Sequence, residues 1–448
     1  MLFTFVKCYI ILMLYMRCGL GASQDSASAP AVTCGLSLSR DGATCETDEK
    51  GVCICNLQKY IPVYDDFALK KFPGLLHFKL VTNGLLSVLP PKAISLASSS
   101  GQVTVQDDGG MFGIVPGAFT GLRAYSLNIS HTNIKRLMPG ALRNVSVQRL
   151  YLDDNKINRI DDYTFSGVCD SIDDLSLKNN PIELVKANSF KYFPNLTKLS
   201  LSDNSLNDGR LTIEPGAFHG LEKLKVLDLS SSKLHADGKL PIRVGGSLEK
   251  LDLSRNGMNL TCDADMFQDA RNLKVVDYSH NILKDFSCIE ALRVAPNLEE
   301  LHLLDMKFDV SINEISRHSL EGFPKLKSLN LADAKLTSFH PEAFSTLKNI
   351  RELRLGLGEG AHLSLDILNP VAETIRSVFL RLYGNDVVLS ANDLKPTVST
   401  LVVLVPLLRA DCNFSNISSA CDAFYGDVAV TCTRDFCSRT PRNAESES

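Results

Sequence analysis

The sequence carries no excess of positive charge: 47 Lys and Arg residues stand against 51 Asp and Glu residues, a formal net charge of −4 at pH 7. This balance gives no electrostatic attraction for nucleic acid or for an anionic membrane surface. A nucleophile elbow, an H-E-x-x-H segment, a phosphate-binding loop and an EF-hand loop are all missing from the sequence. We therefore expect no nucleic-acid partner, no enzyme activity, no metal site and no cofactor.

The late part of the chain lacks an apolar run long enough to cross a membrane. Its longest run, Leu401 to Leu408, is interrupted by Pro406, and nothing after Cys437 is apolar. We expect no membrane anchor.

The first residues have the pattern of a secretory signal peptide. A short apolar run from Tyr9 to Met16 follows Lys7 and ends before small residues. Such a run is too short to span a bilayer. We expect a signal peptide at 1–21, cleaved after Gly21 or Ala22, and a secreted, extracellular protein. A buried N-terminal helix is the alternative, which the polar residues that follow at once disfavour.

Cysteine, in contrast, is plentiful, with 13 residues in the chain. Cleavage removes two, and eight of the others form two groups near the ends: Cys34, Cys45, Cys53 and Cys55, and Cys412, Cys421, Cys432 and Cys437. In a secreted chain such groups indicate disulfide-stapled caps, with zinc binding as the weaker alternative. Six N-x-[ST] sequons predict N-glycosylation, at Asn128, Asn144, Asn195, Asn259, Asn413 and Asn416.

One short segment suggests another function. Residues 356–361, GLGEGA, read G-x-G-x-x-A after a strand-like run, the outline of a dinucleotide-binding turn. Such a turn needs a long helix after it within a βαβ unit, and Pro370 leaves little room for one. We interpret the segment as part of a repeat.

This repeat runs along most of the chain. Segments 147–157 (VQRLYLDDNKI) and 196–206 (LTKLSLSDNSL) share the scheme L-x-x-L-x-L-x-x-N-x-L. Its second apolar position occurs fourteen times, 23 to 28 residues apart, at 78, 103, 127, 150, 175, 199, 227, 251, 276, 301, 329, 353, 378 and 401. Alternate strand residues point to opposite faces, so the leucines lie inside. A single turn cannot offset its own ordering entropy, so the turns must stack into one parallel sheet whose ends need covers.

The ninth position of the repeat is polar in the first part of the chain. An asparagine there can hydrogen-bond the backbone of the turn where water cannot reach. We assign this role to Asn83, Asn155, Asn180, Asn204, Asn256 and Asn281, with Asp108, Thr132 and Ser232 as substitutes. Later repeats place Met306, Ala334, Gly358, Tyr383 and Pro406 there, so we expect the C-terminal third to be less regular.

The second half of several repeats carries a P-G-A-F or P-E-A-F segment, ending at Phe119, Phe218 and Phe344. We predict a short turn or helix with a buried phenylalanine, on the side away from the sheet.

Residues 75 to about 405 resemble the extracellular animal-type leucine-rich repeats of Toll-like receptor ectodomains and small leucine-rich proteoglycans, through the asparagine and P-G-A-F segments above. The resemblance implies an α/β solenoid, a curved horseshoe with a concave parallel β-sheet, and a binding role. The expected order is signal peptide 1–21, Cys-rich N-terminal cap 22–74, about 14 repeats over 75–405, and a Cys-rich C-terminal cap with a polar tail, 406–448.

On the concave face, the residue between the two strand leucines offers candidate partner contacts. Asp228, Asp252 and Asp277 would stack at roughly 5 Å intervals, and like charges at that spacing repel unless a cationic partner or solvent relieves them. Further on, the surface becomes basic and aromatic, which is the composition of interface anchors. The candidate set is Asp228, Asp252, Asp277, His302, Arg354, Phe379 and Arg381, with Arg351 and Arg376 beside it. A plain solvated surface is the alternative.

Paired acids at 153–154, 161–162 and 173–174 could serve calcium or glycosidase-like chemistry, but solvated surface is the better interpretation. Cys262 and Cys288 lie one period apart, which predicts a disulfide between neighbouring turns. Cys169 has no evident partner; it is either a buried thiol or the site of a disulfide to another chain.

These features predict a secreted protein that binds another macromolecule, a protein or a glycan, on its concave face. A recognition or receptor-like role in immunity or development is our first choice. A component of the extracellular matrix or of adhesion, and a non-catalytic subunit of a secreted enzyme complex, remain as alternatives.

Overall fold

The structure is a computed structural model. It describes residues 43–50, 52–57, 77–91, 93–94, 101–168, 170–205, 209–235, 245–260, 262, 264–283, 287–304, 307–308, 314–383, 387–390, 400–404 and 429–430. They form two compact units: unit 1 contains 1–200, 204–209 and 216–223, and unit 2 contains 201–203, 210–215 and 224–448.

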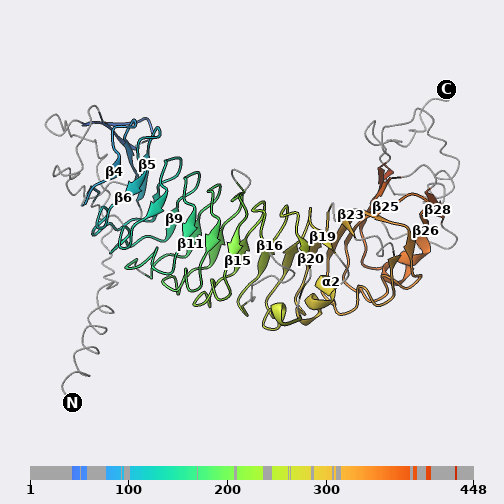
Figure 1. Cartoon of the computed structure of the whole chain (residues 1–448). Coiled ribbons are helices and arrows are strands. Elements are labelled where there is room, and N and C mark those ends of the chain that lie inside the picture. Colours follow the sequence, from blue (N-terminus) through green and yellow to red (C-terminus); the bar gives the residue numbers. More distant parts are fainter. Residues whose placement is uncertain are drawn as a thin grey trace, which may run out of the picture. The chain divides into compact units, whose positions relative to one another are not determined.

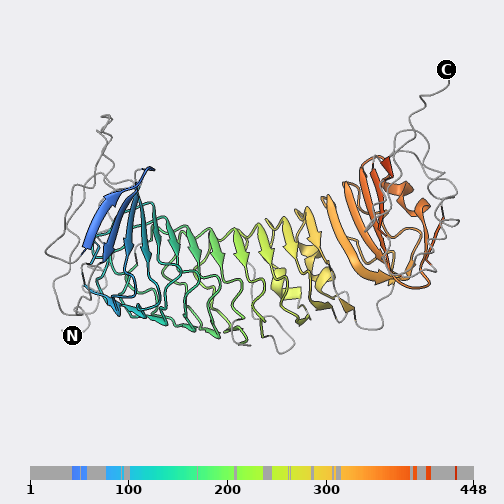
Figure 2. The same cartoon turned by 90° about the horizontal axis from the view of Figure 1, so that it is seen from above.

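Each unit is a parallel β-solenoid in which every turn adds one strand to a main sheet (Figure 1). In unit 1 these strands are β1 (Ala43–Thr47), β2 (Cys53–Leu57), β3 (His77–Val81), β5 (Gln102–Gln106), β7 (Ser126–Asn128), β9 (Arg149–Tyr151), β11 (Asp174–Ser176) and β13 (Lys198–Ser200). They lie side by side as a row of arrows in Figure 2.

In unit 2 the main-sheet strands are β15 (Val226–Asp228), β16 (Lys250–Asp252), β18 (Val275–Asp277), β20 (Glu300–His302), β23 (Ser328–Leu336), β25 (Glu352–Leu357), β27 (Ser377–Leu382), β29 (Thr400–Leu404) and β30 (Ala429–Val430). All fourteen positions predicted from the repeat fall within strands of the main sheet. The predicted parallel solenoid is confirmed.

Short strands form a second layer on the side away from the main sheet. In unit 1 they are β4 (Val88–Leu89), β6 (Gly113–Ile114), β8 (Arg136–Leu137), β10 (Arg159–Ile160) and β12 (Leu184–Val185). In unit 2 they are β14 (Thr212–Ile213), β17 (Asn259–Leu260), β19 (Ile282–Leu283), β21 (Lys307–Phe308), β22 (Glu314–Ile315), β24 (Ser338–Phe339), β26 (His362–Ser364) and β28 (Val388–Ser390). The helical segments of unit 2 are α2 (Ser287–Ala291) and the 3₁₀ helices η2 (Ala264–Phe267), η3 (Leu292–Val294) and η4 (Leu365–Val371).

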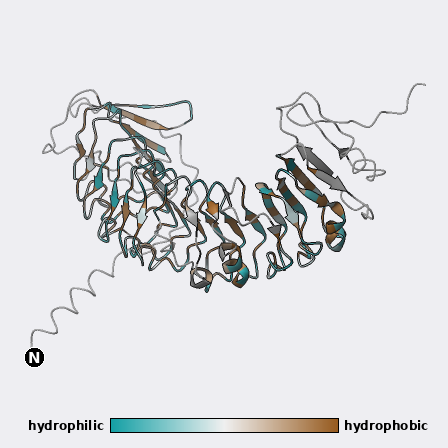
Figure 3. Ribbon diagram, turned by 45° about the vertical axis from the view of Figure 1, so that its right-hand side comes forward, coloured by the Kyte–Doolittle hydropathy of each residue, from teal (hydrophilic) through white to brown (hydrophobic). Residues whose placement is uncertain are grey.

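The core lies between the two layers. Main-sheet strands alternate buried and partly exposed residues, as in β9, where only Leu150 is fully buried. Figure 3 shows hydrophobic and hydrophilic residues alternating along the strands. Phe119 and Phe344 are buried in turns as predicted, whereas Phe218 is half-buried and stacks on Phe190 at 5.9 Å. These rings fill the side of the core away from the main sheet.

After the first repeats, the asparagines of the ninth position are buried. Each side chain hydrogen-bonds the backbone of the preceding turn as well as that of its own turn. Asn155 is fully buried; its Nδ2 donates to the carbonyls of Ile129 and Leu152, and its Oδ1 accepts the N–H of Ile134. Asn180 repeats this pattern, donating to Leu152 and Leu177. Asn256 and Asn281 do the same in unit 2. Ser232 acts as the predicted substitute, donating to the Leu201 carbonyl, whereas the buried Thr132 donates to the side chain of Asn155 instead.

In the first repeats the buried polar position lies one residue earlier than assigned, although Asn83 makes the predicted backbone hydrogen bond, donating from Nδ2 to the Leu57 carbonyl at 3.0 Å. Asn83 and Asp108 are exposed, and the buried positions are Thr82 and Asp107. The carboxylate of Asp107 accepts a hydrogen bond from the Thr82 hydroxyl and others from the backbone N–H groups of Gly84, Gly109 and Met111. The early turns reach their polar position one residue sooner, which the spacing of the leucines could not reveal.

The G-x-G segment has a structural role in the repeat where the asparagine is missing. Instead of turning, β23 continues to Leu336, with a register shift against β25 after Leu331. A Cβ atom at Gly356 would overlap the carbonyl oxygen of Ala332, and one at Gly358 would overlap that of Lys335. The glycines therefore permit close approach of two strands.

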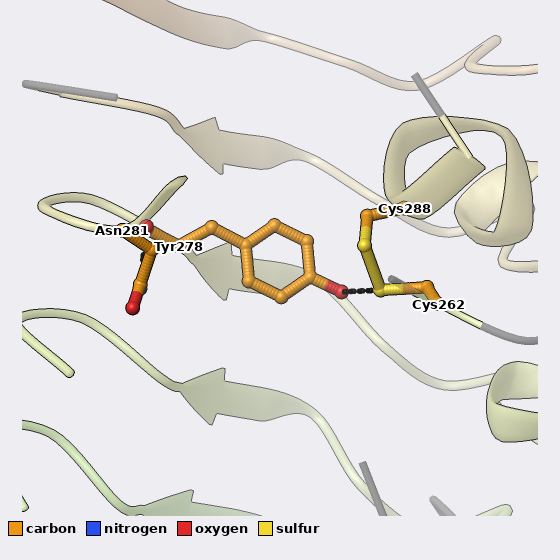
Figure 4. The surroundings of a disulfide bond; sticks show 4 residues. All are labelled: Cys262, Tyr278, Asn281 and Cys288. Atoms are coloured by element: carbon orange, nitrogen blue, oxygen red, sulfur yellow. Dashed lines mark hydrogen bonds between the residues drawn. A yellow bond between two sulfur atoms is a disulfide. The ribbon is translucent and has the colours of Figure 1, made fainter. Parts of the chain in front are cut away.

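A disulfide joins Cys262 to Cys288 of α2, with 4.6 Å between the Cα atoms (Figure 4). Tyr278 takes the place of the second strand leucine in this repeat and is fully buried. Its hydroxyl lies 3.9 Å from the Cys262 sulfur, and burial raises the pKa of this phenol. The larger ring thus spans the interior between the main sheet and the disulfide.

At the N-terminal end, β1 and β2 pair antiparallel, and β2 pairs parallel with β3. Cys45 and Cys55 face each other across the hairpin and form a disulfide. This arrangement is consistent with a capping disulfide. Cys34, Cys169, Cys412, Cys421, Cys432 and Cys437 lie outside the described residues.

Replacing Asp107 by Ala should lower the free energy of unfolding by about 3–5 kcal/mol, because several buried donors lose a charged acceptor. The adjacent exposed Asp108→Ala is the matched control and should change it by less than about 0.5 kcal/mol. Urea denaturation followed by circular dichroism measures both. Equal effects of the two substitutions would contradict the register described here.

Gly356→Ala should cost at least about 2 kcal/mol, because the added methyl meets backbone rather than a side chain that can move. Gly245 has nothing within 4 Å of an added Cβ, so Gly245→Ala serves as the control. Similar melting temperatures for both variants would show that the strands can separate at no cost.

Peptide mapping without reduction should recover Cys262 linked to Cys288, because the two residues occupy neighbouring turns at bonding distance. A link from either residue to a cysteine of the terminal groups would refute this pairing.

Candidate partner-binding surface

The outward side chains of the unit 2 main sheet form a continuous row, which we call the central column. Each member lies between two buried strand residues, so strand alternation turns it to the outer face. Parallel pairing brings the members into register one after another: Asp228, Asp252, Asp277, His302, Asn330, Arg354 and Phe379. The structure thus brings together six of the seven candidate residues, and Arg381 follows Phe379 two residues later in β27.

The three aspartates of the central column also hold the ends of their own strands. Asp228 Oδ1 accepts hydrogen bonds from the N–H and hydroxyl of Ser230, at 3.1 and 2.7 Å. Asp252 makes the same two bonds to Ser254, at 3.0 and 2.7 Å. Charge reversal at these positions would therefore remove local hydrogen bonds, while an asparagine keeps the acceptor and removes only the charge.

The negative charges of these aspartates repel one another. Partial burial raises the pKa of Asp252, the Ser254 hydrogen bonds oppose the rise, and the neighbouring charges of Asp277 and Asp228 add to it. A positive group placed over this column would relieve that repulsion.

The aromatic end of the column is a stacked pair. The Arg354 guanidinium lies 4.4 Å from the centre of the Phe379 ring, and its Nε is 2.5 Å from Glu352 Oε1. Both groups are only partly buried. An arginine fixed on an aromatic ring and held by a carboxylate presents a flat, preorganised contact surface.

The predicted basic stretch is compensated by acids on the same face. Arg381 reaches past its register partner Gly356 to Asp333, two strands away, at 2.6 Å. The same guanidinium lies 5.2 Å from the Tyr383 ring. Because Arg354 and Arg381 each have a carboxylate partner, their positive charge is largely balanced before any partner arrives.

A second row of charges, which the sequence analysis missed, precedes the strands of unit 2. Glu249 lies between Lys225 and Lys274, at 3.1 and 2.8 Å, and Glu299 pairs with Lys327 at 2.7 Å. Hydrogen bonds from Lys274 and Lys225 lower the pKa of Glu249. The signal was available, since charges alternate in sign one residue before the strands from β15 to β23: Lys225, Glu249, Lys274, Glu299 and Lys327.

Unit 1 also carries an outer-face cluster that the sequence analysis missed, which we call the tyrosine cluster: Tyr125, Arg149, Tyr151 and Asp174. The Arg149 guanidinium lies 4.8 Å from the Tyr125 ring and hydrogen-bonds Tyr151. Arg149 and Asp174 are in register on β9 and β11. Burial raises the pKa of Asp174, and Lys198 and Arg149 oppose the rise.

The paired acids do not converge on a common site. Asp153 lies on the outer face and accepts from the Ser176 hydroxyl at 2.6 Å, whereas Asp154 accepts from Asn179. Asp161 follows β10 in the second layer and pairs with Arg159 and Lys186. Among the described residues, no group of three or more His, Cys, Asp or Glu side chains could hold a metal ion.

The remaining predicted features are only partly described. Asn128, Asn144 and Asn195 lie within the described residues, Asn259 is placed in β17, and Asn413 and Asn416 lie outside them, as does the expected signal peptide. Within the part of the chain that is described, none of the helices has the length and apolar character of a membrane span.

Comparison with known proteins agrees with the solenoid. A family model for leucine-rich repeats matches residues 145–206 and 296–356. Mouse CD180 antigen is 26% identical over 54% of this chain and 36% of its own length, and human Toll-like receptor 8 is 28% identical over 52% and 20%. Human podocan-like protein 1 is 26% identical over 65% of this chain and 58% of its own length. The chain thus spans less than two thirds of the length of each of these relatives.

Among solved structures, the mouse RP105/MD-1 complex contains a chain with a TM-score of 0.54 and 21% identity, covering 82% of this chain and 66% of that one. At this identity the likeness shows the fold alone. Together with the repeat itself, these matches show a leucine-rich-repeat protein that resembles the extracellular leucine-rich-repeat receptors and proteoglycans of animals.

Proposed function

We propose that this chain is a secreted recognition protein that captures a protein partner on the outer face of the unit 2 main sheet. The contact surface is the central column together with Arg381. No catalytic step is part of this function; the chain acts by binding.

The observation that carries the proposal is the stacked pair of Arg354 and Phe379. Arginine and aromatic residues are enriched among the few side chains that supply most interface energy. Here the guanidinium is already fixed by the ring and by Glu352, so little side-chain entropy remains to be lost on binding.

The aspartates supply the second part of the surface. They are in register on three successive strands and lower each other's tendency to ionise. Three carboxylates are in register from Asp228 to Asp277, whereas Arg354 and Arg381 each already pair with an acid. We therefore expect the partner to bring basic side chains to the column and an apolar or aromatic group to Phe379. Such complementarity acts mainly on partner choice and association rate.

The comparisons support a binding role in general. The relatives are receptors and proteoglycans, and the solved RP105/MD-1 structure is, by its name, a complex of two proteins. A matrix component is the second candidate, since the match to podocan-like protein 1 covers 65% of this chain. A subunit of a secreted enzyme complex, linked to its partner by a disulfide from Cys169, is the third candidate.

The full-length protein is immobilised and incubated with extracellular fluid from its natural source. The proteins that it captures are then quantified by mass spectrometry. Phe379→Ala removes the ring beneath Arg354 and should reduce capture of the true partner about tenfold. Asp252→Asn with Asp277→Asn keeps the strand-end hydrogen bonds and should slow association and weaken its dependence on salt.

The control is Val294→Ala, which changes a residue that is 45% exposed in η3, away from the main sheet. Capture that survives both sheet variants, or that falls equally with Val294→Ala, would show that the partner binds elsewhere. Recovery of fibrous matrix proteins would favour the second candidate, and recovery of an enzyme released only by reduction would favour the third.

A further inference from the structure

Two sequons of unit 1 differ in the hydrogen bonds of their asparagine. The sequon hydroxyl is engaged in both: Thr197 Oγ1 donates to the Asp173 carbonyl, and Ser130 Oγ accepts the N–H of Asp153. Both polar atoms of the Asn195 side chain make hydrogen bonds: Nδ2 donates to the Asp170 carbonyl at 2.7 Å, and Oδ1 accepts from Lys223 Nζ at 2.6 Å. Both ends of the Asn195 sequon therefore bond to the preceding turn.

The Asn195 contact is a repeated structural bond. Asn272, Asn297 and Asn349 occupy the same place in other turns, and each Nδ2 donates to a carbonyl 25 or 26 residues earlier, at 2.6–2.7 Å. None of these three asparagines is in a sequon. The position thus serves turn stacking wherever it occurs, with or without a sequon.

Asn128 is different. It lies in β7 on the outer face, and its Oδ1 accepts the N–H of Ser130 at 2.9 Å. Within the described part of the chain, Nδ2 makes no hydrogen bond. The carboxamide is held at its oxygen while its nitrogen, the atom that an N-linked sugar uses, is left available.

The neighbour of Asn128 on the next strand is Tyr151, in direct register. Adjacent strands are separated by about 4.8 Å, so a sugar ring attached to Asn128 reaches across to the tyrosine. Tyr151 is partly exposed, and Arg149 and Asp174 lie beside it on the same face. An aromatic face next to hydrogen-bonding groups matches a sugar, which has an apolar C–H face and polar hydroxyls.

We infer that Asn128 carries an N-linked glycan whose first N-acetylglucosamine packs on Tyr151, so that the tyrosine cluster is a seat for the chain's own sugar. The inference rests on secretion, which is part of the proposed function, and it adds a consequence. The outer face of unit 1 between β7 and β11 is covered by glycan, and the partner is left with the face of unit 2.

Asn144 offers an internal comparison. It is exposed, and its backbone N–H donates to Gly167, but it lies in a turn away from the main sheet and no ring contact to it is found among the described residues. A glycan at Asn144 should therefore have no aromatic ring to pack on.

The test uses the full chain expressed in a eukaryotic secretory host. Glycopeptide mass spectrometry measures occupancy, and melting temperature is recorded before and after removal of N-glycans by peptide N-glycosidase, which converts the asparagine to aspartate. Asn128→Asp is then chemically matched to the enzyme product at that position. Ser146→Ala removes the Asn144 sequon as the control.

We expect Asn128 to be occupied and the melting temperature of the wild-type protein to fall by about 2 °C on deglycosylation. Asn128→Asp and Tyr151→Ala should lose this difference between their glycosylated and deglycosylated forms, whereas Ser146→Ala should keep it. Comparing two glycoforms of each variant removes any effect of the substitution on basal stability.

Two results would overturn the inference: Asn128 empty while Asn195 is occupied, or an undiminished shift in Tyr151→Ala. A partner captured by wild type and lost in Tyr151→Ala would instead assign the tyrosine cluster to protein binding. The proposed function is judged separately, since the capture experiment changes only residues of unit 2.

Discussion

The structure depends on one requirement, that the buried backbone of each turn must find hydrogen-bond partners without water. A turn of this solenoid exposes carbonyl and N–H groups to its own interior, and an unpaired group there costs about 1–3 kcal/mol. Asn155, Asn180, Asn256 and Asn281 meet this requirement with one side chain each, because a carboxamide both donates and accepts. Where the asparagine is absent, as at Gly358, the chain does not leave the turn unpaired. It extends the strand, and β23 and β25 become longer than their predecessors.

Much of this could be predicted from the sequence, because the period of the repeat can be read directly from the spacing of its leucines. The strand positions follow from leucine spacing alone, and the neighbourhood of Cys262 and Cys288 follows from the same period. Thr82 and Asp107 were missed because the buried polar residue stands one position earlier in these turns, at a point that no leucine marks. The role of Gly356 was also missed, since the close approach of the Ala332 carbonyl is a tertiary distance.

The outer face was harder to predict for a different reason. Inspecting one position per repeat identified the central column but not the tyrosine cluster, whose members Tyr125 and Arg149 occupy the neighbouring positions. Nor could the sequence show that the Arg381 side chain extends past Gly356, its register partner, to reach Asp333. As a result, the sequence predicted the positions of Arg354 and Arg381 but not the acids, Glu352 and Asp333, that pair with them.

The direction of the asparagine bonds has a consequence for how the chain is made. Asn155 serves the carbonyl of Ile129 and the N–H of Ile134, and Asn204 accepts the N–H of Asn180, so each side chain completes the turn that precedes it in the sequence. A turn therefore gains its full set of side-chain hydrogen bonds only when the following turn has been synthesised and has packed against it. In a solenoid built from the N-terminus, the last turn added is the one whose buried backbone groups still lack these partners.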